Sequence, residues 1–319
     1  MVRKKELRKG TMTMKVAVGI DIGGTKIAIG LVREDGKVLK EIEFPTNVDG
    51  GPDQALEKMI QYIKSLYTVE PNIIGIGIGS PGPLDTKAGI VLEPPNLQSW
   101  HGYPLVQKID SAFRTKVKLI NDADAAAFAE YYYSHRSVYS HMIYVTVSTG
   151  IGGGLILNGE LYEGVLSGAG EIGHMSMASN GPLCGCGKIG CLEAFSSGTG
   201  MMNTWKKKLE SLQQPFDPDW TGKDLFEQGA SGETTAAEVV KSGADYLARG
   251  ISQAVQLLNP ELVVLGGGIV LAQPTFYQQV VQAVPNYLLD HHKRNIVFAI
   301  AEQGRTAGFK GAAAAVLAE

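Results

Sequence analysis

Short runs of β-branched and other apolar residues, separated by turn residues, mark the beginning of the chain. KVAVGIDI, KIAIGLVRE and KVLKEIEFP predict three successive strands, and Asp35-Gly36 is a favoured hairpin turn between the last two. In GPDQALEKMIQYIKSLY the apolar residues recur three and four positions apart, which predicts a helix with one buried face. NIIGIGIGS then predicts a buried strand, and VKLINDADAAAFAEYYY predicts a strand that turns directly into a helix at Asn121 or Asp122.

The pattern starts again near residue 142. MIYVTVSTGIGGGLILNGELYEG predicts a strand, a glycine-rich turn, a second strand and an Asn158-Gly159 hairpin turn. Each half therefore opens with a hairpin whose tip carries glycines and a threonine, Thr25 or Thr149. Farther on, AAEVVKSGADYLARGISQAVQLL predicts a helix, ELVVLGGG a strand, and TAGFKGAAAAVLA a helix that packs back on an earlier lobe. Alternating strands and helices predict an α/β fold, and the two similar openings predict two lobes that face each other across a cleft.

Composition narrows the class of protein. A chain of 319 residues is long enough for two domains with separate cores. The formal net charge of −3 gives no reason to expect nucleic acid or a membrane surface as a partner. No apolar run approaches the roughly 20 residues that span a bilayer, and the basic segment MVRKKELRKGTMTM lacks a signal-peptide core and is expected to be a tail.

Three glycine-rich turns are candidates for phosphate and nucleotide binding, because backbone N–H groups can converge on a phosphate where no side chain intrudes. In DIGGTK, Thr25 adds a hydroxyl, Lys26 adds charge, and Asp21 could hold Mg²⁺ through water. Each turn alone could equally be a tight turn that needs positive φ, but three such turns favour a ligand. The residues expected to bind the nucleotide are Asp21, Gly23, Gly24, Thr25, Lys26, Thr149, Gly150, Gly152, Gly153, Gly266, Gly267 and Gly268.

Two common nucleotide-binding motifs are excluded. The chain has no GxxxxGK[ST], so it is not a P-loop protein. A GxGxxG runs from Gly77 to Gly82, but Pro81 and Pro83 stand where a Rossmann helix would begin, which argues against dinucleotide binding.

All three cysteines lie in one short loop, GPLCGCGKIGC. His174, Cys184, Cys186 and Cys191 together offer three sulfurs and one imidazole, a set that fills a tetrahedral Zn²⁺ shell. Four protein ligands leave no open position, so the predicted zinc is structural; free thiols are the alternative. An odd number of clustered cysteines also argues against a disulfide framework and for a reducing, cytoplasmic compartment.

Several polar residues could do chemistry. Asp122 stands where a strand becomes a helix, and alone it is as well explained as a helix N-cap. Asn121, Glu171, His174 and Glu193 offer the carboxylates, amide and imidazole that a polyhydroxylated ligand needs, although solvated loop acids are the plain alternative for Glu171 and Glu193.

The motifs DIGGTK, SPGPLD, NDADAAA, STGIGGG, EIGH and CGCGKIGCLE, in this order, closely resemble those of the ROK sugar kinases, from about Val16 to the end of the chain. The resemblance implies the actin-like, hexokinase-type (ribonuclease H-like) ATPase fold. It implies a small lobe of residues 1–122, completed by a C-terminal helix of about residues 300–319, and a large lobe of residues 123–299 with the zinc loop. It also suggests a cytoplasmic homodimer.

The resemblance further implies a site. Asp122 would be the general base that takes the proton from the sugar hydroxyl, which decides its role in favour of catalysis. Asn121, Glu171, His174 and Glu193 would bind the hexose, with one ring nitrogen of His174 on zinc and the other on sugar. The two Gly–Thr hairpins would hold the ATP phosphates, with Mg²⁺ near Asp21.

The expected reaction is phosphorylation of the 6-hydroxyl of a hexose, with glucose as the leading substrate and N-acetylmannosamine or N-acetylglucosamine as alternatives. The family also contains repressors with an N-terminal helix-turn-helix, and the roughly 14 residues before the first strand are too few for that module. A sugar-sensing regulator without catalysis and a zinc-stabilised structural protein are the alternatives from other classes.

Overall fold

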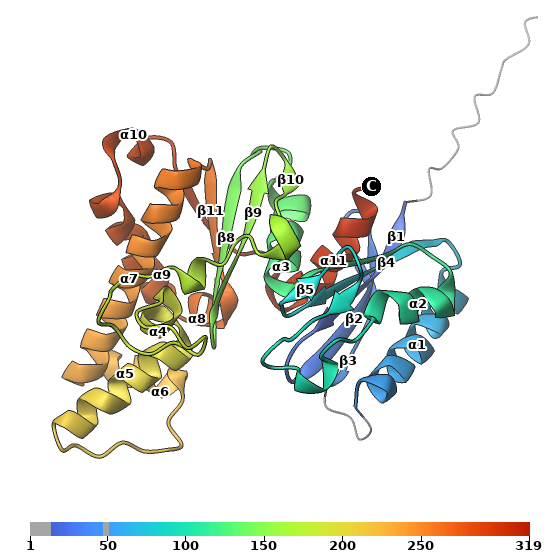
Figure 1. Ribbon diagram of the computed structural model, residues 1–319. Coiled ribbons are helices and arrows are strands. Elements are labelled where there is room, and N and C mark those ends of the chain that lie inside the picture. Colours follow the sequence, from blue (N-terminus) through green and yellow to red (C-terminus); the bar gives the residue numbers. More distant parts are fainter. Residues whose placement is uncertain (1–13, 47–50) are drawn as a thin grey trace, which may run out of the picture.

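The computed structural model describes residues 14–46 and 51–319. Two five-stranded β-sheets stand apart, with helices α3 (Asp122–Glu130) and α11 (Ala307–Leu317) between them and further helices on their outer faces (Figure 1). Residues 1–13, most of the expected tail, lie outside the described residues. In the described part of the chain, no helix has both the length and the apolar character to cross a membrane.

The first sheet confirms the strands predicted from the first half of the sequence. Its order is β3-β2-β1-β4-β7, in which the first three strands are antiparallel and β4 and β7 run parallel to β1. Two helices, α1 (Pro52–Val69) and α2 (Leu105–Phe113), bury their apolar residues against its outer face. The strands are β1 (Val16–Ile22), β2 (Lys26–Arg33), β3 (Val38–Pro45), β4 (Ile73–Ser80) and β7 (Val117–Asn121).

The second sheet repeats the first. Its order, β10-β9-β8-β11-β12, again joins an antiparallel hairpin to parallel strands, as the repeated sequence pattern predicted. The long helix α7 (Thr234–Leu258) and α9 (Pro274–Ala283) pack on its outer face. The strands are β8 (Met142–Val147), β9 (Ile151–Leu157), β10 (Glu160–Leu161), β11 (Leu262–Gly266) and β12 (Val297–Ile300).

The remaining elements are short or peripheral. They are the β5 (Leu84–Asp85) and β6 (Ile90–Val91) hairpin, α4 (Leu192–Ser196), α5 (Gly198–Ser211), α6 (Gly222–Ala230), α8 (Gly267–Ala272), α10 (Asp290–Lys293), a π-helical turn (Tyr131–His135) and 3₁₀ turns at Gln98–Trp100, Val165–Ser167, Ile172–His174, Val284–Tyr287 and Gly304–Thr306.

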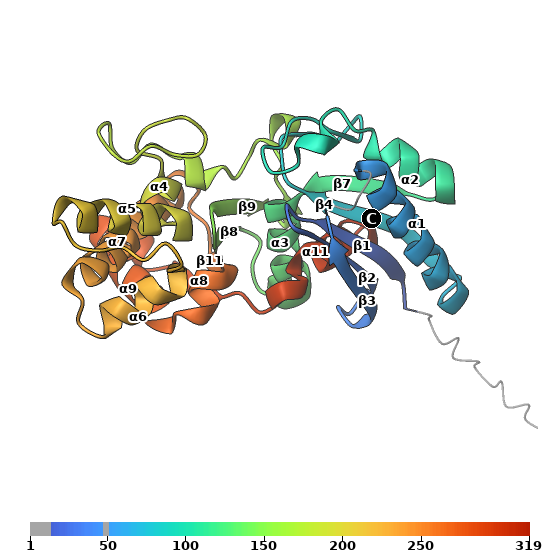
Figure 2. The same cartoon turned by 90° about the horizontal axis from the view of Figure 1, so that it is seen from below.

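Two helices fill the space between the sheets, α3 (Asp122–Glu130) and α11 (Ala307–Leu317) (Figure 2). Glycine makes this close packing possible. A Cβ at Gly19 or Gly77 would overlap the backbone of α11, and one at Gly311 would overlap the carbonyl of Ala125 in α3. Gly77 is the first glycine of the GxGxxG motif, and the close approach of α11 explains why a glycine stands there without any role in dinucleotide binding. The helix predicted near the C-terminus therefore does pack on the first sheet, whereas the lobe boundaries at residues 122 and 299 stay a prediction.

Candidate active site

A cavity of about 650 Å³ lies between the two lobes. Its walls come from the end of β1, the start of α3, the β8–β9 turn, α4, the start of α8 and the start of α11. It therefore brings together residues that are far apart in the sequence. The residues predicted for the site that line it are Asp21, Gly23, Asp122, Thr149, Gly150, Gly152, Glu193, Gly267 and Gly268.

The start of α3 separates two roles that the sequence left open. Asn121 is the N-cap: its side-chain oxygen accepts hydrogen bonds from the backbone N–H of Ala123 (2.9 Å) and Asp124 (3.3 Å). Asp122 is the first helical residue, and its carboxylate lines the cavity. Because desolvation outweighs the hydrogen bond from the Ala123 N–H, the pKa of Asp122 is raised, and the negative charge of Glu171 adds to this. A carboxylate with raised proton affinity suits a general base.

Asp21 is a second perturbed carboxyl group in the cavity. Desolvation raises its pKa to about 6, the charge of Asp122 adds to the rise, and Lys26 opposes it. A Cβ at Gly308, in the first turn of α11, would overlap the Asp21 carboxyl group. Two carboxylates with raised pKa values in one cavity form an oxygen-rich environment that suits Mg²⁺.

The glycine turns differ in what surrounds them. Gly268 faces open space apart from the Ser148 hydroxyl, so backbone is accessible there. By contrast, a Cβ at Gly153 would collide with the Gly170 carbonyl, and one at Gly266 would collide with the Tyr144 hydroxyl. Close packing is therefore enough to explain why glycine stands at both positions. The predicted nucleotide-binding residues that do not line the cavity are Gly24, Thr25, Lys26, Gly153 and Gly266. The predicted sugar-binding residues Asn121, Glu171 and His174 do not line it either, and Glu171 lines a separate apolar hollow instead. The part of all these residues in binding stays a prediction. Lys26 pairs with Glu43 at 2.6 Å on the surface.

The residues predicted to hold a sugar come from three separate segments. Glu193, in the first turn of α4, accepts a hydrogen bond from the Ile151 N–H (2.9 Å), which fixes the helix to the tip of the β8–β9 hairpin. Glu171 precedes a 3₁₀ turn and His174 ends it, with His174 Nε2 3.9 Å from the Glu171 carboxylate. Strand β9 lies between this loop and α3, because Gly153 lies against Gly170 and the neighbouring Gly152 lies against Ala123.

The cysteine–histidine cluster has the dimensions of a tetrahedral metal site. The ligand atoms of His174, Cys184, Cys186 and Cys191 all lie within 4.8 Å of one another. The Cys186–Cys191 Sγ distance is 3.7 Å, and Cys184 Sγ lies 3.8 Å from His174 Nδ1. A zinc ion with Zn–S bonds of about 2.3 Å has S···S edges of about 3.8 Å, so these residues fit that ion. The two ring nitrogens of His174 therefore have different neighbours: Nδ1 lies beside Cys184 Sγ, and Nε2 lies toward Glu171.

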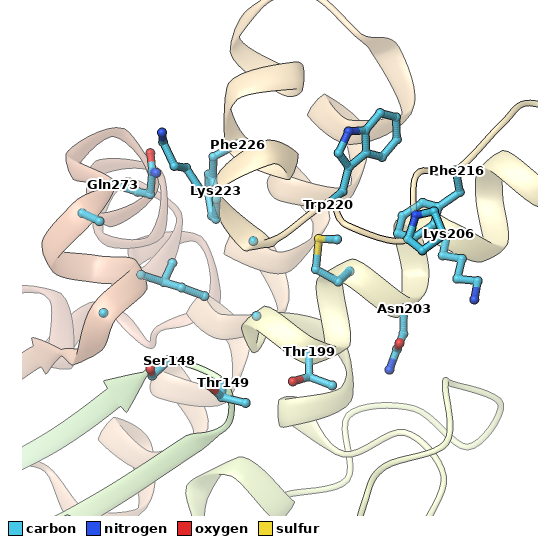
Figure 3. Close-up of a pocket in the computed structure, with 17 residues that line it drawn as sticks. Ser148, Thr149, Thr199, Asn203, Lys206, Phe216, Trp220, Lys223, Phe226 and Gln273 are labelled. Atoms are coloured by element: carbon cyan, nitrogen blue, oxygen red, sulfur yellow. The ribbon is translucent and has the colours of Figure 1, made fainter. Parts of the chain in front are cut away.

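Sequence reasoning missed a second cavity, of about 710 Å³, which shares Ser148, Thr149 and Gly268 with the first. Aromatic rings and polar or basic side chains line it: Asn203, Lys206, Phe216, Trp220, Lys223, Phe226 and Gln273 (Figure 3). Trp220 stacks on the fully buried Trp205 with ring centroids 4.7 Å apart. The only sequence signal was the aromatic segment PFDPDW, which has no helical or strand period.

These features define a class of protein. Two lobes with the same strand order, a cleft between them and a carboxylate at the start of the helix between the sheets characterise the actin-like ATPase fold in its hexokinase form, as predicted. The chain belongs to the ROK family, whose model matches residues 17–319.

Relatives of the chain include sugar kinases. The chain is 34% identical to a glucokinase of Thermotoga maritima, over 85% of this chain and 88% of that protein. It is 31% identical to an N-acetylmannosamine kinase of Salmonella typhi, over 93% of this chain and 96% of that protein. Among solved structures, a ROK family glucokinase of Streptomyces griseus in complex with glucose and AMPPNP superimposes with a TM-score of 0.75, at 28% identity, over 93% of this chain and 98% of that one.

Proposed function

We propose that this protein is an ATP-dependent sugar kinase that phosphorylates the 6-hydroxyl of a hexose, with glucose as the leading substrate. The observation that carries the proposal is the position of Asp122. Asp122 lines the cleft with the glycine turns and Glu193, and the charge of Glu171 contributes to its raised pKa; this supports a role as proton acceptor close to residues suited to phosphates and to hydroxyls. The glucokinase relative and the solved complex with glucose and AMPPNP support this choice of substrates.

In the proposed reaction, Asp122 accepts the proton of the 6-hydroxyl as that oxygen bonds to the γ-phosphorus. The bond from this phosphorus to the bridging oxygen breaks, and ADP leaves with the electron pair. Asn121, Glu171, His174 and Glu193 orient the sugar. The glycine turns hold the phosphates, and the aromatic second cavity receives the nucleoside.

Two metal ions belong to the proposal. Mg²⁺ near Asp21 would neutralise phosphate charge during transfer. Zn²⁺ on His174, Cys184, Cys186 and Cys191 would be structural, because four protein ligands complete its shell. Burial raises the pKa of Cys184 to about 12, so a cation is needed to hold this ligand as a thiolate.

A second candidate substrate class is N-acetylated hexosamines, because one relative is an N-acetylmannosamine kinase of similar identity. The residues proposed to hold ring hydroxyls would serve either sugar. The difference lies in the space around C2 of the sugar.

The proposal is tested by ADP release with ATP, Mg²⁺ and a panel of glucose, mannose, fructose, N-acetylglucosamine and N-acetylmannosamine. We expect the highest kcat/KM with glucose; a preference for an acetylated sugar would keep the mechanism and change the substrate.

The Asp122→Asn variant should retain the dissociation constant for glucose within about threefold and lose at least 100-fold in kcat, within the usual range for general base catalysis. Near-normal turnover in this variant would refute the base assignment. If the wild-type protein released no ADP with any sugar of the panel, a sugar-sensing regulator without catalysis would be favoured.

We also propose a cytoplasmic homodimer. An apolar hollow of about 430 Å³ on the large lobe is lined by Leu155, Met175, Leu257 and Leu258, and the Leu257 side chain is 83% exposed. An apolar surface of this kind favours an interface, and a second copy of the chain is the partner proposed for it.

A further inference from the structure

The main chain passes from one sheet to the other twice, and one buried carboxylate joins the two crossings. The first crossing runs from β7 through α3 and the π-helical turn to β8, and the second runs from β12 to α11. Glu130, the last residue of α3, is completely buried. Its two carboxylate oxygens accept hydrogen bonds from the backbone N–H groups of Glu302 (2.9 Å) and Gln303 (2.8 Å), which lie in the second crossing.

Side chains extend this connection on the surface side. Ser134, in the π-helical turn, donates to the Glu302 carboxylate (2.9 Å) and accepts from the Gln303 amide (2.8 Å). Lys310, in α11, donates to the Gln303 side-chain oxygen. Isolated π-helical turns are rare and often occur at functional positions, and this one begins at the residue after Glu130.

Both joined segments contribute to the wall of the cleft. Asp122 begins α3 and Glu130 ends it, so the helix that holds the proposed base is fixed at its far end. The residue after Gln303 is Gly304, which has a positive φ of 56° and lines the cavity with Gly308. If one lobe moves relative to the other, the backbone of both crossings must change conformation, and Glu130 joins these two segments by hydrogen bonds.

We propose that Glu130 is a positioning residue for phosphoryl transfer. It fixes the position of the two crossings relative to each other. When the lobes close, residues 304–308 then approach the nucleotide phosphates while Asp122 approaches the sugar hydroxyl. This inference rests on the proposed function. Glu130 touches neither substrate, so its effect is on closure and on the donor side of the cleft.

The test is Glu130→Gln, which preserves shape and leaves only one oxygen acceptor for two N–H donors. We expect a rise of at least 10-fold in the KM for ATP and a fall of at least 10-fold in kcat. The dissociation constant for sugar without nucleotide should stay within about twofold of the wild-type value. X-ray scattering should show that sugar plus AMPPNP shrinks the wild-type protein and not the variant.

Glu261→Gln is the matched control. Glu261 also accepts two consecutive backbone hydrogen bonds, from Ser140 (2.6 Å) and His141 (2.9 Å), but these anchor β8 to β11 within one sheet. This control should lose thermal stability and keep both KM values. Wild-type KM for ATP and wild-type closure in Glu130→Gln would overturn the proposal and leave Glu130 a structural residue.

A milder variant keeps the test decisive if Glu130→Gln does not fold. Ser134→Ala removes two side-chain hydrogen bonds of the same connection, leaves the Glu130 bonds in place and should raise the KM for ATP about threefold; no change would then overturn the proposal. The wild-type assay separates this inference from the proposed function. An inactive wild-type protein refutes the kinase proposal and this inference with it, whereas an active wild-type protein with unaffected variants refutes only the role of Glu130.

Discussion

At the scale of single residues, three polar side chains at the start of α3 have three different environments. Asn121 caps the helix, Asp122 faces the cleft, and Asp124 is buried with both carboxylate oxygens free of hydrogen-bond partners among the described residues. Burial, aided by the charge of Glu163, raises the pKa of Asp124 to about 8. The motif NDAD gave no sign of this difference, because it depends on β9 packing over α3 and on the charge of Glu163, which is distant in the sequence.

Replacing Asp124 by Asn should change how stability depends on pH. Between about pH 4 and pH 8 the folded protein keeps the Asp124 proton while the unfolded chain has lost it, so stability falls as pH rises. This single group contributes a slope of about −1.4 kcal/mol per pH unit over that range. We expect Asp124→Asn to be more stable than the wild type at pH 8, with the difference shrinking toward pH 4. Urea denaturation of both proteins at several pH values measures it, and parallel curves would contradict the prediction.

At the scale of elements, the cysteine loop supports the sugar side of the site. Cys184 and Cys191 are buried, and the loop connects Glu171 and His174 to Glu193 at the start of α4. One zinc ion per chain is expected by elemental analysis. Chelation followed by removal of the chelator should raise the KM for sugar at least 10-fold and leave the KM for ATP within twofold. Zinc, and not Mg²⁺, should restore the enzyme; a zinc-free protein with an unchanged KM for sugar would show that the loop is independent of metal.

Gly19 and Gly77, the glycines of the first sheet on which α11 packs, give a stability prediction at the same scale. A methyl group at Gly77 would overlap the Ala312 carbonyl, and neither backbone can yield without moving α11 off the sheet. Gly77→Ala should cost about 3 kcal/mol or more, at the upper end of overpacking effects. Gly222→Ala, where a Cβ meets no atom within 4 Å, is the control and should melt near the wild-type temperature. Equal melting temperatures for both variants would contradict this account of the packing.

At the scale of the whole molecule, sequence periodicity predicted the two lobes, and the order of motifs predicted the family. Local patterns predicted that α3 begins at Asn121 or Asp122 and that the three cysteines lie with His174, but they did not predict that Asn121, and not Asp122, caps the helix. Residues whose role depends on distant partners were not predictable. Glu130 meets its partners about 170 positions later in the chain, and Trp220 gains its place in the second cavity by stacking on Trp205. Neither relation leaves a local signal.

The proposed homodimer is tested at this scale too. Leu257→Asp places a charge on the apolar hollow and should convert the protein from dimer to monomer, measured by size-exclusion chromatography with light scattering. Leu212 is 56% exposed and lies outside the hollow, so Leu212→Asp should leave the dimer intact. A monomeric wild-type protein, or dimers in both variants, would reject this interface.

The position of α11 bears on how the chain is made. The ribosome produces β1 and β4 early, yet the helix that covers their inner face follows β12 and is made after the whole second sheet. Multi-lobed chains usually complete their parts in the order of synthesis. Here the lobe that emerges first is completed last, so its apolar inner face stays uncovered during translation until α11 arrives.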